Sequence, residues 1–184
     1  MSRHLFVSDT HFGHRAILSP RMQAPRPFAS IEEHDETLIA NWNAVVRPDD
    51  TIWHLGDFCY RCSEDHARSV FGRLRGRNRF LVRGNHDRIS VCLPWDGIFD
   101  VARVAAHDPA TGATVGLFLF HYACRVWDRM HRGDLHLYGH SHGTLPGTAA
   151  STDVGVDCFG FRPVTLDEIR VRLAENAARD GGLP

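Results

Sequence analysis

Residues Arg83-Gly84-Asn85-His86-Asp87 follow directly on the apolar run Phe80-Leu81-Val82, and they decide how the rest of the chain is interpreted. The apolar run predicts a buried strand, and the glycine predicts a turn at its end. Packing alone needs neither the asparagine nor the histidine of this turn. We therefore expect both side chains to serve a polar site at the end of the strand.

Four further polar clusters follow apolar, strand-like runs in the same way. They are Asp9-Thr10-His11, Gly56-Asp57, His121 and Gly139-His140-Ser141-His142. In open α/β sheets, binding sites gather beyond the carboxyl ends of the strands. Five strand ends are therefore predicted to deliver these residues to one site.

Helices are predicted where capping residues precede apolar residues at helical spacing. Ser30 with Glu33, and Thr165 with Glu168, have the spacing of capping boxes, and Ser63 is the predicted N-cap of a helix between them. In the first half of the chain these helices alternate with strands. Alternation predicts parallel strands joined by helical crossovers.

Hairpins rather than helical crossovers are predicted to dominate the second half. Residues 101–106 and 114–120 predict a hairpin, and residues 152–158 predict a further strand, whereas the prolines of residues 17–29 predict a loop beside the first polar cluster. Because hairpins give antiparallel strands, we expect an α/β sandwich of mixed sheets with helices outside.

Composition predicts a soluble globular protein. The chain has 184 residues, 43% of them apolar and 23% charged, which is typical of one domain spanning residues 1–184. A net charge of -1 gives the whole molecule no strong attraction to nucleic acid or to an anionic membrane. No apolar run approaches the roughly 20 residues of a membrane span. Five scattered cysteines form no disulfide framework, so we expect a cytoplasmic location.

The residue types of the five clusters are typical of metal ligands. Asp9 and His11 offer an oxygen and a nitrogen two residues apart, and His140 and His142 repeat that spacing. Asp57 has two oxygens and could bridge two cations. This mixture suits Mn, Fe, Zn, Ni or Co better than Mg or Ca. We expect two divalent transition-metal ions, with manganese as the first expectation.

A two-metal site predicts phosphoester chemistry. Two cations about 3.5 to 4 Å apart can hold a hydroxide between them and clamp the oxygens of a phosphate, which the hydroxide attacks in line. The leaving oxygen then needs a proton or a positive charge. Asn85 offers a neutral carbonyl oxygen, which is a weak metal ligand. His86 stands beside it without being a ligand, and we expect it to assist the leaving group. Asp87 is predicted to hold the ring of His86 and to raise its pKa.

The five motifs, complete and in this order, resemble those of the calcineurin-like metallophosphoesterases. The resemblance spans positions 9 to 142, and the combination is specific although Gly-Asp alone is not. It implies a four-layer α-β-β-α sandwich of two mixed sheets flanked by helices, and the small size of the chain implies no added cap domain. The resemblance also implies a first metal held by Asp9, His11 and His142, a bridging Asp57, and a second metal held by Asn85, His121 and His140.

Within that family the chain is most similar to a small bacterial group. The resemblance rests on the extended first motif Ser8-Asp9-Thr10-His11-Phe12-Gly13-His14, on residues 121–127, and on Val154-Gly155-Val156-Asp157 followed by Arg162-Pro163-Val164. Ala123 departs from the group, which often carries a proline after His-Tyr, and this bears on the shape of that loop.

Several residues near the motifs have two interpretations. His14 and Arg15 could contact the substrate phosphate, or His14 could support a ligand. Arg125 could line the substrate pocket together with Trp127, but a tryptophan in such a run is more often packed. His54, inside an apolar strand, is expected to be a core histidine.

Two further patterns favour structural roles. Arg73, Arg75, Arg77 and Arg79 could attract a polyanion, but cations at the end of a helix complement its dipole. Cys59 and Cys62 have the spacing of a redox or zinc pair, but no second pair accompanies them.

The sequence thus predicts a metal-dependent phosphoric ester hydrolase acting on a phosphodiester, or on a phosphomonoester. Its substrate could be a nucleotide or a nucleic acid. The absence of room for a specificity cap favours diesters. The alternative is a non-catalytic scaffold of the same fold that binds a partner, and the complete set of ligand-type residues argues against it.

Overall fold

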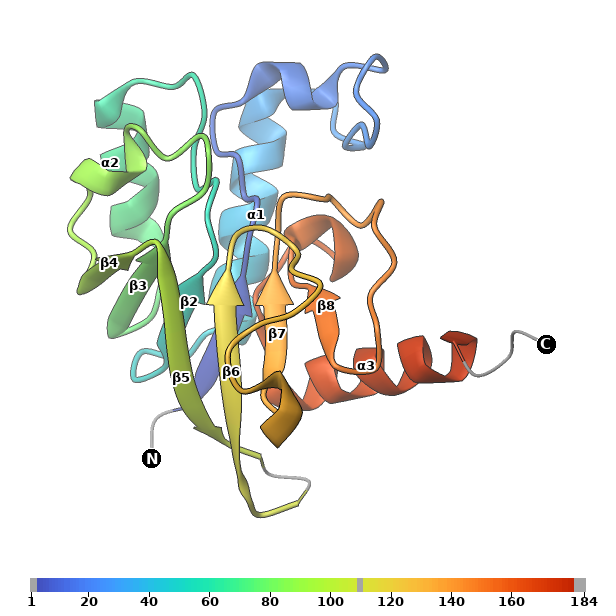
Figure 1. Cartoon of the computed structure of the whole chain (residues 1–184). Helices are drawn as coiled ribbons and strands as arrows, with labels where there is room; N and C mark the ends of the chain where they lie inside the picture. Colours follow the sequence, from blue (N-terminus) through green and yellow to red (C-terminus); the bar gives the residue numbers. More distant parts are fainter. Residues whose placement is uncertain (1–2, 109–110, 181–184) are drawn as a thin grey trace.

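The computed structural model describes residues 3–108 and 111–180, and two β-sheets stand at its centre. The first sheet has the strand order β4-β3-β2-β1-β9 (Figure 1). Strands β1 to β4 pair in parallel, and β9 pairs antiparallel with β1. Their bounds are β1 His4–Val7, β2 Thr51–His54, β3 Asn78–Val82, β4 Gly97–Phe99 and β9 Val164–Thr165.

The second sheet has the order β5-β6-β7-β8 and is also mixed. Strand β5 pairs antiparallel with β6, whereas β6 with β7 and β7 with β8 are parallel pairs. The arrows of β6 and β7 therefore point the same way in Figure 1. The bounds are β5 Val101–His107, β6 Thr114–Phe120, β7 Leu135–Tyr138 and β8 Ser151–Asp153.

The three α-helices begin where the capping residues predict. They are α1 Ile31–Val45, α2 Glu64–Arg73 and α3 Leu166–Asp180. The Ser30 hydroxyl accepts the Glu33 N–H, and the Ser63 hydroxyl accepts the His66 N–H. At α3, Glu168 accepts the backbone N–H of Thr165 at 2.9 Å, as a capping box requires. Among the described helices, none combines the length and the apolar character needed to cross a membrane.

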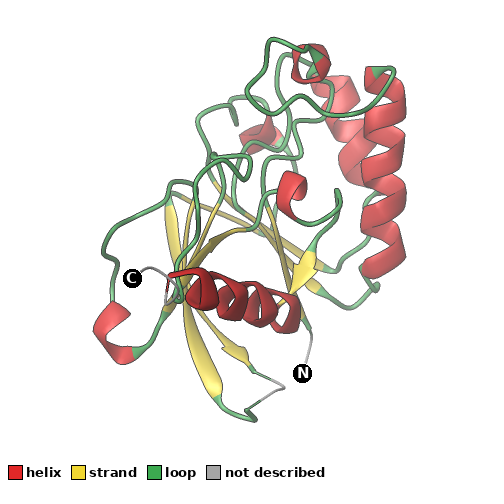
Figure 2. Cartoon of the chain, turned by 90° about the vertical axis from the view of Figure 1, so that its right-hand side faces the viewer, coloured by secondary structure: helices red, strands yellow, loops and turns green. Residues whose placement is uncertain are grey.

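Apolar side chains form one packed layer on each face of the first sheet. Leu5 and Val7 of β1 point toward α1 and α2, where Trp42 and Phe71 are buried. Phe6 points the other way, into the layer shared with the second sheet and α3. This alternation along β1 is the expected period of a strand with both faces covered. Figures 1 and 2 show α1 and α2 together on one side of the first sheet.

The predicted α/β fold of two mixed sheets with flanking helices is therefore confirmed. Its details differ from prediction in four places, three of them in single elements. Strand β4, only three residues long, was not predicted. The predicted strand 152–158 is the short β8 followed by a 3₁₀ turn at Val156–Cys158. The first two residues of the predicted loop 17–29 belong to a 3₁₀ turn at Arg15–Leu18.

The second half of the chain contains one hairpin rather than several. Strands β5 and β6 form it as predicted, and its turn residues 109–110 lie outside the described part of the chain. Strands β6, β7 and β8 run parallel because the segments 121–134 and 139–150 return along the sheet before each new strand begins. Further 3₁₀ turns lie at Ser90–Cys92 and Met130–Arg132.

Candidate metal centre

The predicted site residues lie on backbone turns that side chains rarely adopt. Five of them have φ between 47° and 67°: Asp9, His11, Asp57, His140 and His142. This left-handed region costs a residue with a Cβ atom on the order of 1 kcal/mol. The strain turns each side chain out of its strand direction, at the ends of β1, β2 and β7. Strain concentrated in this way marks a functional site.

A first group of potential ligands comprises Asp9, His11 and His142, whose donor atoms lie within 4.8 Å of one another. Asp9 Oδ2 accepts the backbone N–H of His140 at 2.9 Å, whereas Asp9 Oδ1 and His11 Nε2 are buried without a hydrogen-bond partner. A buried polar atom without a partner is costly. A cation between these atoms would satisfy both of them.

A second group comprises Asp57, His121 and His140, again within 4.8 Å. His121 Nδ1 donates to the Leu55 carbonyl at 2.7 Å, so Nε2 carries a lone pair. That lone pair faces Asn85 Oδ1 at 3.2 Å and Asp57 Oδ2 at 3.6 Å. Three acceptors converging on one point, with no proton between them, form the arrangement that a metal ion stabilises.

Asp57 stands between the two groups. Its Oδ2 atom lies 3.6 Å from His11 Nε2 and also 3.6 Å from His121 Nε2. Its Oδ1 atom accepts the backbone N–H of His86 at 2.9 Å. One oxygen is therefore free to bridge two cations, while the other fixes the turn that carries His86.

Burial makes the charges of this site costly in the absence of a cation. Burial raises the pKa of Asp9 to about 7 and also raises the pKa of Asp57. Burial lowers the pKa of His11 well below its usual range. Neutral imidazoles can donate a lone pair to a cation, and the buried carboxylates are stabilised as anions by its positive charge. This combination of ligands is typical of transition-metal sites. The donor set thus fits two divalent cations, and the exact ligands of each remain predictions.

His142 is oriented by a carboxylate that the sequence interpretation gave no role. Its Nδ1 atom donates to Asp157 Oδ2 at 2.8 Å, which leaves Nε2 for the first group. Although burial opposes it, this hydrogen bond raises the pKa of His142, and together with Arg26 it holds the pKa of Asp157 well below its usual range. A carboxylate behind a ligating histidine fixes its tautomer and ring orientation.

Arg26 completes this support from the proline-rich loop and was also missed. Its guanidinium donates to both oxygens of Asp157 at 2.8 Å, and to the carbonyls of Asp9 and Thr10 at 2.5 and 2.9 Å. It also contacts His34 Nε2 at 2.8 Å. The side chain is only 1% exposed. Arg26 therefore ties the loop to the first group, although no local sequence pattern indicates this.

His86 lies beside the two groups without belonging to either. Its ring centroid is 4.0 Å from that of Tyr60 and 5.7 Å from that of His11. The prediction that Asp87 holds this ring is wrong. Asp87 is buried beneath the turn, and its carboxylate accepts the N–H groups of Asp57, Phe58 and Gly84. It fixes the two strand-end turns to each other instead.

The three predicted substrate contacts differ in their positions. His14 is buried against Tyr60 and His11, and burial lowers its pKa to about 4, so it is neutral at pH 7 and supports its neighbours. Arg15 is exposed and pairs with Glu32 at 2.9 Å on the surface, and its contact with a substrate stays a prediction. Arg125 is exposed after His121.

The structural interpretations of the other residues agree with their contacts. His54 is fully buried and hydrogen-bonds Thr10 Oγ1 at 3.0 Å. Trp127 Nε1 donates to the Asp134 carbonyl at 2.8 Å and is packed. Arg73 pairs with Glu36, and Arg79 donates to the Phe71 carbonyl, so these arginines fasten neighbouring elements.

Cys59 and Cys62 are both free thiols. A hydrogen bond from Cys59 lowers the pKa of Cys62 to about 7. Within residues 3–108 and 111–180, neither thiol belongs to a group of three potential metal ligands. A zinc site at this pair therefore gains no support.

Comparisons with known proteins agree with the geometry. A family model described as calcineurin-like phosphoesterase matches residues 2–120. An uncharacterized protein of Methanocaldococcus jannaschii is 30% identical over 183 residues, which cover 95% of this chain and 93% of that protein. The Gene 66 protein of Mycobacterium phage L5 is 40% identical over 89 residues, 47% of this chain and 41% of that protein.

One solved structure has a similar fold. A protein of unknown function from Aquifex aeolicus aligns with a TM-score of 0.62 at 21% identity, covering 92% of this chain and 98% of that one. At this identity the likeness concerns the fold alone.

Proposed function

The chain belongs to the calcineurin-like phosphoesterase family, and from that premise we propose that it hydrolyses a phosphodiester with the help of two divalent transition-metal ions. Manganese is the first expectation, and iron, zinc, nickel and cobalt are alternatives. The observation that supports this most strongly is the single oxygen Asp57 Oδ2, placed equally far from His11 of one ligand group and His121 of the other.

Each of the two groups of potential ligands is proposed to hold one metal ion. Asp9, His11 and His142 would hold one ion, and Asn85, His121 and His140 the other, with Asp57 between them. Bound there, the ions would lower the pKa of the attacking water and neutralise the charge that develops on the phosphate. The chain itself supplies the fixed geometry, since most of these side chains are locked by backbone contacts or burial.

His86 is proposed to assist the leaving group. The hydrogen bond from its backbone N–H to Asp57 Oδ1 fixes its distance from the bridging carboxylate, and Tyr60 packs on its ring. A positioned imidazole can donate a proton to the departing oxygen, which contributes typically 10²- to 10⁴-fold to a rate. Asp87 acts indirectly, because it holds the turns on which Asp57 and His86 stand.

The reaction class is tested by an assay in which the metal is controlled. The metal-free chain is loaded with Mn, Fe, Zn, Ni or Co and offered bis-p-nitrophenyl phosphate, p-nitrophenyl phosphate, nucleotides and short DNA or RNA. We expect metal-dependent turnover and a higher kcat/KM for the diester. A preference for the monoester would contradict the diester assignment. A chain that binds none of these metals and cleaves none of these esters would support the non-catalytic scaffold instead.

A further inference from the structure

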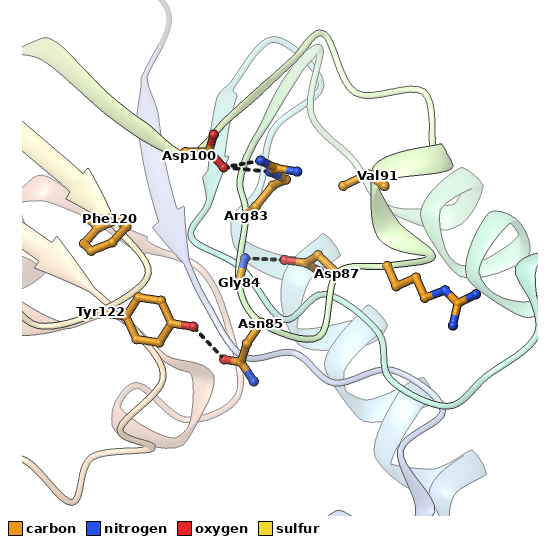
Figure 3. Close-up of a pocket in the computed structure, with 9 residues that line it drawn as sticks. Arg83, Gly84, Asn85, Asp87, Val91, Asp100, Phe120 and Tyr122 are labelled. Atoms are coloured by element: carbon orange, nitrogen blue, oxygen red, sulfur yellow. Dashed lines mark hydrogen bonds and ion pairs between the residues drawn. The ribbon is translucent and has the colours of Figure 1, made fainter.

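A cavity of about 440 Å³ lies directly beside Asn85. Figure 3 shows Gly84 and Asn85 on one side of it and the aromatic rings of Phe120 and Tyr122 on the other. Because Asn85 Oδ1 is a proposed metal ligand, this cavity adjoins the second ligand group. The cavity is therefore part of the surroundings of the reacting phosphate.

The aromatic wall of the cavity is open to a ligand. Tyr122 is 38% exposed, although large aromatic side chains are usually covered. Its ring packs edge-on against Phe120 at 5.4 Å, and its hydroxyl donates to Asn85 Oδ1 at 3.4 Å (Figure 3). Both contacts hold the ring in place while part of its surface stays uncovered. A rigid, partly exposed ring is suited to stacking against another ring.

Among the charged side chains that line the cavity, one arginine is available to bind a ligand. Arg83 is neutralised by Asp100, with which it forms an ion pair at the rim (Figure 3). Asp87 is buried and occupied by backbone N–H groups. Arg88, which also lines the cavity, has no side-chain hydrogen bond or ion pair within the described residues. Its guanidinium is free to bind an anionic group on a ligand.

The cavity is distinct from the place where His86 acts. The ring of His86 packs against Tyr60 and lies near His11, and none of these three residues lines the cavity. In a diester the leaving group must lie near His86, so the group that stays on phosphorus needs a different place. The cavity beside Asn85 provides it.

We propose that this cavity is the subsite for the retained ester group, and that it binds a nucleoside-type group whose ring stacks on Tyr122 and whose additional phosphate pairs with Arg88. This assignment rests on the proposed diesterase function. It explains physically why a diester would be preferred, since a monoester leaves the cavity empty. The retained group would appear in the product as a nucleotide.

The stacking is tested with two diesters that share one leaving group. Thymidine 5′-(p-nitrophenyl) phosphate and methyl p-nitrophenyl phosphate both release p-nitrophenolate and differ only in the retained group. We expect the wild type to favour the thymidine ester by about tenfold or more in kcat/KM. Tyr122→Ala should lose most of that ratio, and Tyr122→Phe should keep it. An unchanged ratio in Tyr122→Ala, or an equal loss in Tyr122→Phe, would overturn the stacking role.

The role of Arg88 is tested with the same ester carrying a 3′-phosphate. The added phosphate should raise kcat/KM about threefold to tenfold in the wild type, and Arg88→Ala should lose this gain. Arg132→Ala, an exposed arginine outside the cavity, is the matched control and should keep it. Retention of the gain in Arg88→Ala would contradict the assignment.

Failure of the subsite and failure of the proposed function give different results. If the wild type cleaved neither diester with any metal, the diesterase function would fail. Binding of thymidine 3′,5′-bisphosphate, measured by calorimetry, would still test the cavity. Binding that weakens about tenfold in Tyr122→Ala supports the subsite, and no binding to the wild type refutes it.

Discussion

At the scale of single residues, the support of His142 shows how this site is built. The imidazole can present Nε2 to a cation only because Asp157 accepts its Nδ1 proton, and Asp157 keeps its place because Arg26 holds both of its oxygens. Each member is fixed by the next, and the chain of contacts ends in the backbone of Asp9 and Thr10. The metal affinity of the first group should therefore depend on residues that touch no metal.

The first prediction concerns Asp157→Asn. An asparagine has only one acceptor oxygen and no charge, so its NH2 group must face either Arg26 Nε or the position of Oδ2, which accepts from both Arg26 and His142. Either placement sets donor against donor and weakens the support of the His142 ring. We expect metal affinity of the first group to fall about 10- to 100-fold, measured by titration of the metal-free chain. Asp134→Asn is a matched control, because it weakens a partly buried ion pair with Arg103 away from both groups. Equal losses in the two variants would contradict the role of Asp157.

The same residues show where sequence reasoning stops. The sequence could predict that the proposed ligands lie at strand ends because each follows an apolar run, which is a local signal. Arg26 and Asp157 are 131 residues apart along the chain, and only the folded structure brings them together. Asp87 was assigned to His86 because the two are adjacent in sequence, yet its carboxylate points away, to the turn after β2.

At the scale of elements, the turn after β3 depends on the absence of a side chain at Gly84. A Cβ atom there would lie 2.3 Å from Asp57 Oδ1 and 2.9 Å from His121 Cε1. Gly84 is not among the glycines with positive φ, so space rather than backbone conformation requires it. The sequence therefore predicts the turn at the right position. What requires a glycine there is the lack of space for a side chain, which the sequence does not reveal.

The second prediction is that Gly84→Ala displaces Asp57 and weakens both metal sites at once. We expect the variant to bind fewer than two ions per chain, measured by elemental analysis after dialysis against metal, with turnover reduced at least tenfold. Gly72→Ala is the control, because that glycine lies in α2 with nothing within 4 Å of a Cβ atom. It should bind metal normally and gain up to about 1 kcal/mol of stability. Normal metal content in Gly84→Ala would contradict this account.

Elements with strong local signals were predicted well, and those defined by pairing were not. The N-caps of α1, α2 and α3 depend on residues three positions apart, which the sequence displays. Strand β4 has only three residues and no alternation, and it is recognisable only by its pairing with β3. The parallel pairing of β6 with β7 could not be predicted either, because the segment between them is a loop rather than a helix.

At the scale of the whole molecule, the site lies where the two sheets are fastened together. His121 of the second sheet donates to Leu55 of the first, and the backbone of His140 donates to Asp9. Ser8 also forms an isolated parallel bridge with Gly155. A cation shared between these groups would add a further link, so metal binding should raise the stability of the fold.

The third prediction concerns stability and pH. His54 is fully buried, and burial lowers its pKa to about 4 from an ordinary value of 6.5. The unfolded chain therefore binds a proton there before the folded chain does, so this contribution is complete above pH 6.5 and is lost as pH falls toward 4. The loss amounts to at most about 3 kcal/mol.

The measurement is urea unfolding of the metal-free chain at several values of pH. His54→Gln can still donate to Thr10, and it has no titrating group. The free energy of unfolding should fall less steeply between pH 6.5 and pH 4 in the variant than in the wild type. Parallel curves for the two proteins would show that His54 is not the group responsible.

The central claim is that two ions and a separate histidine share one site, and His86→Ala tests it most directly. The variant is loaded with metal, its ion content is measured by elemental analysis, and its hydrolysis of bis-p-nitrophenyl phosphate is compared with the wild type. His131→Ala, an exposed histidine on the Met130–Arg132 turn, is the control and should behave as wild type. We predict two ions per chain in His86→Ala and turnover reduced by 10²-fold or more. An unchanged rate, or the loss of an ion, would contradict the account.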